Sequence, residues 1–104
     1  MDDAAARHAD KVAAVRRAVF ESAGATEPAL RQAAGAGRPL PEPWGPYADE
    51  VRDRSYRLTD ADIAGLKAAG RSEDEIFEVT VAAAMGAALH RLDAGLRALG
   101  GEAP

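Results

Sequence analysis

Apolar positions recur along the chain with helical spacing, and turn-forming stretches divide it into five segments. In the first segment, four apolar residues share one helical face: Val12, Val15, Val19 and Phe20. The pattern predicts a helix that Asp2 and Asp3 cap, that runs to about Ala23 and that Gly24 ends as the residue after the C-cap.

Two shorter segments follow, separated by a proline-rich stretch. Thr26 is expected to cap a second helix that Gly35 and Gly37 end. Residues 38–46, RPLPEPWGP, contain four prolines, which predict an extended path without a helix. A third helix is expected from Tyr47 to near Tyr56, with one charged and solvated side: Asp49, Glu50, Arg52, Asp53 and Arg54.

Capping patterns mark the last two helices. Thr59, with Asp62 three residues later, predicts a short helix that ends at a turn around Gly70. Ser72 and Glu75 form a full capping box, so the final helix is expected from Glu73 to about Leu99, a length of about 40 Å.

The final helix has two halves of different character. Up to Leu89 nearly every position is apolar or small, so neighbouring helices must surround it; beyond that point the pattern is amphipathic. The small residues around Gly86 would let another backbone approach closely, although glycine costs about 1 kcal/mol relative to alanine in a helix. In so small a chain, part of the cover is expected from a second subunit.

Composition agrees with one all-α domain spanning residues 1–104. Alanine supplies 26 of the 104 residues and aromatic residues only 5%, which favours close packing of helices. The net charge is −4 and the arginines are interleaved with acids, so nucleic acid is not an expected partner. The chain contains no cysteine, which excludes disulfides and thiol catalysis.

Neither a secretory signal nor a membrane anchor is apparent. The N-terminus is rich in acids and alanines, and no apolar run reaches the roughly 20 residues that a membrane span needs. A cytoplasmic location is therefore expected.

Residues 59–99 contain a glycine turn at Gly70, the S-x-D-E-I opening of Ser72 to Ile76 and the small-residue run AAAMGAAL. Over this stretch, about 40% of the chain, the sequence resembles the C-terminal helical part of the alkylhydroperoxidase D-like family, which includes carboxymuconolactone decarboxylases. The resemblance implies a helical bundle with a long central C-terminal helix, assembled as a dimer, trimer or hexamer.

Redox-active members of that family carry a C-x-x-C-x-x-x-H motif before the glycine turn. Counting back from Gly70, the resemblance assigns its positions to Ser55, Leu58 and Asp62, and none of them matches. Thiol-dependent peroxidase activity is therefore excluded. Because decarboxylase members rely on histidine and glutamate chemistry, the resemblance still leaves a cysteine-independent decarboxylase or isomerase as an alternative.

Glu78 and His90 are the acid–base candidates for that alternative. Glu78 falls in the apolar stripe of the last helix, where it would act as a proton acceptor with a raised pKa or form a structural pair, either with an arginine such as Arg16 or Arg17 or with a neighbouring subunit. Pairing is favoured. His90 lies three residues before Asp93, which could orient its imidazole, but an exposed histidine among surface ion pairs is favoured. The two side chains point roughly 120° apart on a helical wheel.

Three aromatic residues are candidates for binding a ligand or partner: Trp44, Tyr47 and Tyr56. Trp44 either anchors the proline-rich loop to the core or contacts a partner protein, and the core role is favoured. Tyr56 is expected to pack against the turn before Thr59. No histidine spacing suits a metal and no glycine-rich phosphate loop is present, so no metal or cofactor is expected.

The favoured function at this stage is a non-redox helical homo-oligomer that binds a small ligand or a partner protein. A helix-turn-helix DNA reader over residues 60–80 is disfavoured. Its second helix would present Glu73, Asp74, Glu75 and Glu78 to the phosphates.

Overall fold

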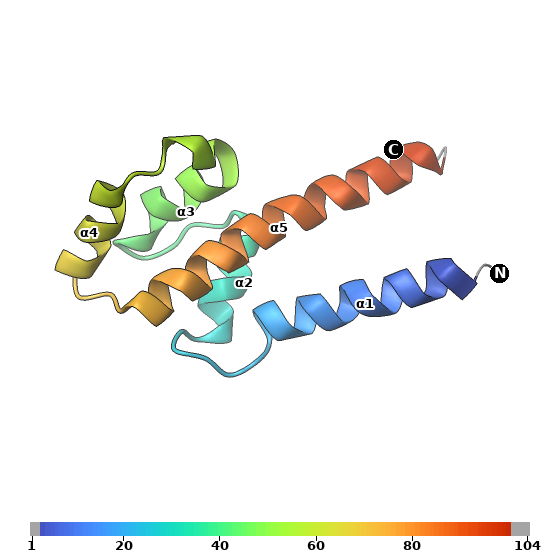
Figure 1. Cartoon of the computed structure of the whole chain (residues 1–104), viewed down its shortest axis with the longest axis horizontal. Helices are drawn as coiled ribbons and strands as arrows, with labels where there is room; N and C mark the ends of the chain where they lie inside the picture. Colours follow the sequence, from blue (N-terminus) through green and yellow to red (C-terminus); the bar gives the residue numbers. More distant parts are fainter. Residues whose placement is uncertain (1–2, 101–104) are drawn as a thin grey trace.

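The computed structural model describes residues 3–100, and this range contains five α-helices, one short 3-10 helix and no strand (Figure 1). The elements are α1 (Asp3–Phe20), α2 (Pro28–Ala36), α3 (Trp44–Arg54), η1 (Ser55–Arg57), α4 (Asp60–Ala68) and α5 (Glu73–Leu99). The expected all-α class is confirmed, while Asp2, the expected cap of the first helix, lies outside the described residues.

Helix α5 is the axis on which the other helices pack. It begins at the expected capping box, in which the Ser72 backbone N–H donates to Glu75 at 2.8 Å and the Glu75 N–H donates back at 3.1 Å. Helices α2, α3 and α4 lie around its N-terminal half, and α1 runs antiparallel beside its C-terminal half (Figure 1). The chain is therefore elongated, with extents of 52 × 27 × 21 Å.

Helices α2 and α5 cross at two glycines. A Cβ atom at Gly86 would lie 2.1 Å from the carbonyl oxygen of Gly35, and a Cβ atom at Gly35 would lie 2.5 Å from the Phe20 ring. Around this crossing Ala82 and Ala83 are fully buried. The expected close approach of a second backbone therefore occurs, and at this crossing that backbone is α2 of the same chain.

The core is closed by aromatic residues from α3. Trp44 is 3% exposed and packs in one apolar cluster with Val79, Leu66 and Ile76, so its core role is confirmed. Tyr47 is 8% exposed and its hydroxyl lies 2.5 Å from Thr80 Oγ1 on α5. Both side chains tie α3 to the axis of the fold.

The expectation that residues 38–46 exclude a helix is wrong for the last three of them. Helix α3 begins at Trp44, whose N–H donates to the Pro41 carbonyl at 2.9 Å. Pro46 lies in the first turn, where the helix has no acceptor for a backbone N–H, so its missing donor costs nothing there. Only the stretch before Trp44 is non-helical.

The expected junction between the first two helices is also wrong in detail. Helix α1 ends at Phe20 instead of near Ala23, and Gly24 lacks the positive φ of the expected C-terminal role. The N-cap of α2 is Glu27 instead of Thr26. Side chains from other helices hold this junction, as described below, and sequence-local capping patterns do not report such contacts.

The described helices contain no candidate membrane span, because none of them is both long and apolar enough.

The helix crossing gives a test that uses two glycines with opposite environments. We expect Gly86→Ala to destabilise the fold by about 1–3 kcal/mol, because the added methyl group overlaps the α2 backbone. Gly65→Ala in α4 is the matched control: its Cβ would meet no atom within 4 Å, and alanine should stabilise that helix by about 0.5–1 kcal/mol. Urea unfolding followed by circular dichroism measures both changes, and equal effects at the two positions would contradict the close crossing.

Candidate functional site

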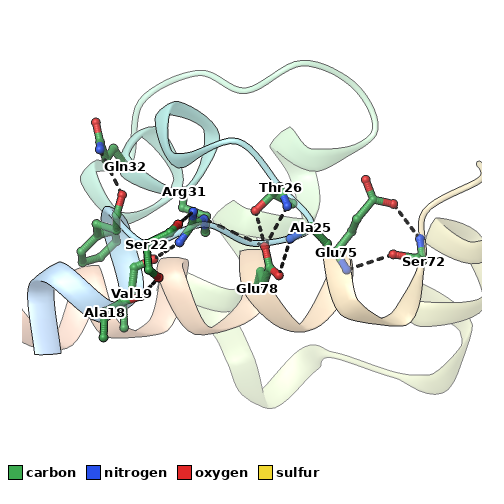
Figure 2. A network of polar contacts seen from close by, with 11 residues as sticks. Ala18, Val19, Ser22, Ala25, Thr26, Arg31, Gln32, Ser72, Glu75 and Glu78 are labelled. Atoms are coloured by element: carbon green, nitrogen blue, oxygen red, sulfur yellow. Dashed lines mark hydrogen bonds and ion pairs between the residues drawn. The ribbon is translucent and has the colours of Figure 1, made fainter.

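Glu78 on α5 lies at the centre of a polar network that joins three helices (Figure 2). Its carboxylate accepts hydrogen bonds from the backbone N–H groups of Ala25 and Thr26, both at 2.8 Å, and from the Thr26 hydroxyl at 2.6 Å. The donors belong to the segment between α1 and α2, so this carboxylate fixes that segment on α5. Thr26 is buried by the contact.

Arg31 of α2 completes the network from the other side. The side chain is only 3% exposed; its Nη1 donates to the Val19 carbonyl at 2.6 Å, and its Nη2 donates to the Ser22 carbonyl. Gln32 also donates, to the Phe20 carbonyl at 3.0 Å. These residues satisfy carbonyls at the end of α1 that the helix itself leaves free, and the cation offsets the negative end of the helix dipole.

The two charged residues of the network also attract each other. Arg31 Nε lies 4.0 Å from Glu78 Oε1, an ion pair without a hydrogen bond between these atoms. The Thr26 hydroxyl lowers the pKa of Glu78 most, the two backbone N–H groups and Arg31 add to this, and partial burial opposes it. Glu78 is therefore ionised and fully engaged, which is the structural role that the sequence favours.

The expected partners of Glu78 are wrong. Arg16 and Arg17 lie on α1, but Arg16 donates instead to Asp93 at 3.1 Å, an exposed ion pair near the other end of α5. Arg31 was missed because the second helix was interpreted only by its apolar face. A buried arginine three positions after a proline at a helix start gives no local signal of its long-range partner.

His90 lies apart from Glu78. It is exposed and lines a small cavity of about 230 Å³ together with Arg16 and Asp93, whereas Glu78 borders a different cavity of about 220 Å³. Twelve residues separate the two side chains along α5, which corresponds to about 18 Å. The structure does not bring this acid–base pair together.

A larger cavity than these two lies elsewhere, as an open cleft of about 500 Å³ between α3, η1 and α4. Apolar and small side chains form most of its wall, and three charged side chains and one tyrosine complete it. The lining residues are Pro43, Pro46, Tyr47, Glu50, Arg57, Leu58, Ala61, Asp62, Gly65 and Leu66. The size is within the range of small-molecule sites, about 300–1,000 Å³.

The Glu50 carboxylate, which lines this cleft, is shared by two arginines, and of these Arg57 also lines the cleft. Glu50 Oε1 lies 3.3 Å from Arg54 Nε and 3.7 Å from Arg57 Nε. The Arg57 side chain is 62% exposed, so most of its donors remain open to solvent. The cluster has one more positive than negative charge, and the sequence interpretation of this region as a solvated face overlooked it because Arg57 lies beyond α3.

The other polar groups of the cleft are already engaged. Thr80 donates its hydroxyl proton to the Ile76 carbonyl at 2.6 Å, so Tyr47 must be the donor in its contact with Thr80. Asp62 accepts from the Thr59 N–H at 2.8 Å, as the expected capping box requires, and also from the Thr59 hydroxyl at 3.1 Å. No free acid–base group is therefore available among them.

Two of the positions that the family resemblance assigns to a redox motif line the cleft: Leu58 and Asp62. Ser55, the third, is exposed at the start of η1. These residues cannot supply a thiolate, so the cleft has no thiol chemistry.

The remaining expectations concern Tyr56 and metals. Tyr56 is 83% exposed, so its expected packing against the turn before Thr59 is wrong. Of the three aromatic candidates, only Tyr47 borders the cleft. Within residues 3–100 no three metal-ligating side chains gather.

Comparison of the chain with protein-family models, with curated proteins and with solved structures finds no match. The fold and the side chains described above are therefore the whole basis for assigning a function.

The Glu78 network gives a pH-dependent test. Because the pKa of Glu78 in the folded protein lies below its ordinary value of 4.5, its stabilising effect is complete above about that pH and is lost as the pH falls through the folded value. We expect Glu78→Gln to lower the free energy of unfolding by about 1–3 kcal/mol at pH 7. The difference from the unmodified protein should shrink as the pH falls below 4.5.

Glu27→Gln is the matched control, because Glu27 lies in the same segment, is exposed and makes no capping hydrogen bond with its side chain. It should change stability by less than about 0.5 kcal/mol. Denaturant unfolding between pH 3 and pH 7 measures both variants. A loss for Glu78→Gln that stays constant over this range would contradict the role of the ionised carboxylate.

Proposed function

We propose that the protein is a non-redox binding module whose α3–η1–α4 cleft holds a small molecule with an apolar body and one anionic group. The observation that carries the proposal is the Glu50 cluster, in which two guanidinium groups share one carboxylate at the wall of a cleft of about 500 Å³. A carboxylate or similar group would take up the excess positive charge.

The apolar part of the ligand would pack against the apolar residues that line the rest of the cleft. Pro43, Pro46 and Leu58 offer side chains without polar atoms, and Gly65 leaves open space where any other residue would place a Cβ atom. Asp62 adds a negative charge, but it lies in the first turn of α4, where the helix dipole and its two hydrogen bonds offset it.

Binding is favoured over catalysis because the polar groups of the cleft are engaged. Tyr47 donates to Thr80, Asp62 caps α4 and Glu50 is ion-paired, so none is free to move a proton. A decarboxylase that uses Glu78 and His90 would need the two within reach of one substrate, and about 18 Å of helix separates them. Membership of the alkylhydroperoxidase D-like family stays a prediction, and the binding proposal does not require it.

The proposal is tested with three eight-carbon probes that differ only in the head group: octanoate, octanol and octylamine. We expect octanoate to bind about tenfold more tightly than octanol, because one charge-assisted contact contributes about 1.4 kcal/mol or more, and octylamine to bind most weakly. Amide chemical shifts from nuclear magnetic resonance should change at Leu58, Ala61 and Gly65.

Three variants complete this test. Gly65→Leu should abolish octanoate binding by filling the cleft, whereas Gly65→Ala should preserve it. Arg57→Gln should remove the preference for octanoate over octanol while octanol binding persists. Equal affinity for the three probes, or shift changes confined to other helices, would refute an anion-selective cleft.

A further inference from the structure

One face of α5 is apolar along almost the whole helix and remains uncovered. We call it the open stripe, and its residues are Phe77, Val81, Ala84, Ala88, Leu92, Gly95 and Leu99. They follow each other at intervals of three or four, so they lie on one side of the helix. Val81 is half-buried and the other six are exposed. At 1.5 Å per residue the stripe is about 33 Å long.

The other sides of α5 are occupied by helices of the same chain. Helix α2 contacts it at Gly86, α3 contacts it at Thr80, and α1 contacts it at Asp93. The open stripe lies between the faces that α1 and α3 cover. No charged residue belongs to it over six turns of helix, although charged residues are frequent elsewhere on the surface.

The open stripe exposes more apolar side-chain surface than is usual for a helix face in contact with solvent. Phe77 is 68% exposed, Leu92 43% and Leu99 86%. Contiguous apolar surface of this kind marks a site of association. At the reach of its side chains plus a water molecule, about 7 Å from the axis, one half of the surface of α5 is about 20 Å wide, so over the length of the stripe it presents roughly 650 Å².

We propose that the open stripe binds the open stripe of a second copy of this chain, with the two α5 helices antiparallel about a two-fold axis at Ala88. In this register Ala88 meets its own copy, Ala84 faces Leu92, and Val81 faces Gly95. At the two inner levels a larger side chain therefore meets a smaller one, as close packing of two helices requires.

Charge selects the antiparallel over the parallel arrangement. Glu73 and Asp74 lie together at the N-terminal end of α5, where Lys67 pairs with Glu73 at 2.7 Å; a parallel pair would bring Asp74 of each copy against that of the other. The antiparallel pair separates these acidic ends and opposes the two helix dipoles favourably. In the antiparallel pair each acidic end lies beside the C-terminal end of the second copy's α5, near which α1 begins (Figure 1); α1 carries the exposed residues Arg7 and Lys11.

The area agrees with a stable dimer. Two patches of roughly 650 Å² bury about 1,300 Å², above the roughly 1,000 Å² that separates specific interfaces from incidental contacts. Helix α2 of the same chain already buries the side of α5 that carries Gly86. The second copy would bury a different side, the open stripe. This inference is independent of the ligand-binding cleft, whose walls come from α3, η1 and α4.

The mass of the protein in solution tests the inference, because light scattering should give about twice the 10.8 kDa of one chain. Ala88→Glu should raise the dissociation constant by about a hundredfold or more, since two carboxylates would meet at the axis. Ala94→Glu is the matched control: it makes the same change at an exposed position of α5 outside the stripe, and it should leave the dimer intact. Helical circular dichroism should be unchanged in both variants.

Disulfide formation tests the direction of the helices. The native chain has no cysteine, so only the introduced cysteines can form a disulfide. Ala88→Cys should form a covalent dimer under mild oxidation. Phe77→Cys alone should not, because the two copies of residue 77 lie about 33 Å apart in the antiparallel pair, whereas a mixture of Phe77→Cys and Leu99→Cys should form the mixed dimer. A monomer at micromolar concentration, equal disruption by Ala94→Glu, or efficient self-linking through residue 77 would each overturn the proposal.

Discussion

The carboxylate of Glu78 and the guanidinium of Arg31 hold the fold together at one point. The carboxylate fixes the segment before α2 on α5, while the guanidinium satisfies the end of α1 from within α2. With both in place, α2 lies close enough to α5 for Gly35 to touch Gly86. The remaining helices pack on this assembled pair, so the cleft and the open face of α5 both depend on it.

The chemistry of the molecule follows from how its polar groups are used. Glu78, Asp62 and Tyr47 each have structural partners, and at the wall of the cleft it is the exposed Arg57 whose donors remain open to solvent. Such a distribution suits recognition better than proton transfer, because a catalytic acid or base must be free to change its protonation state. The open cleft and the apolar face of α5 are the two features on which the proposed ligand binding and the proposed self-association rest.

Sequence reasoning succeeded where the determining contacts are local. The capping boxes at Thr59 and Ser72 lie within four residues of chain, and both helices begin where these patterns predict. It failed where a distant side chain decides the outcome: Arg31 caps a helix twelve residues away, and this contact sets the end of α1. The apolar surroundings of Glu78 predicted that its carboxylate would have a structural partner. Its partner Arg31 could not be identified from the sequence, because it reaches Glu78 only through the position of α2 in the fold.

Because side chains of α2 satisfy the last carbonyls of α1, the first helix has no complete C-terminus of its own. Its carboxyl end becomes stable only after α2 has docked, so α1 should join the structure late during folding and leave it early during unfolding. Amide hydrogen exchange would then divide the molecule into two cooperative units, a persistent body built on α5 and an N-terminal arm that opens by itself.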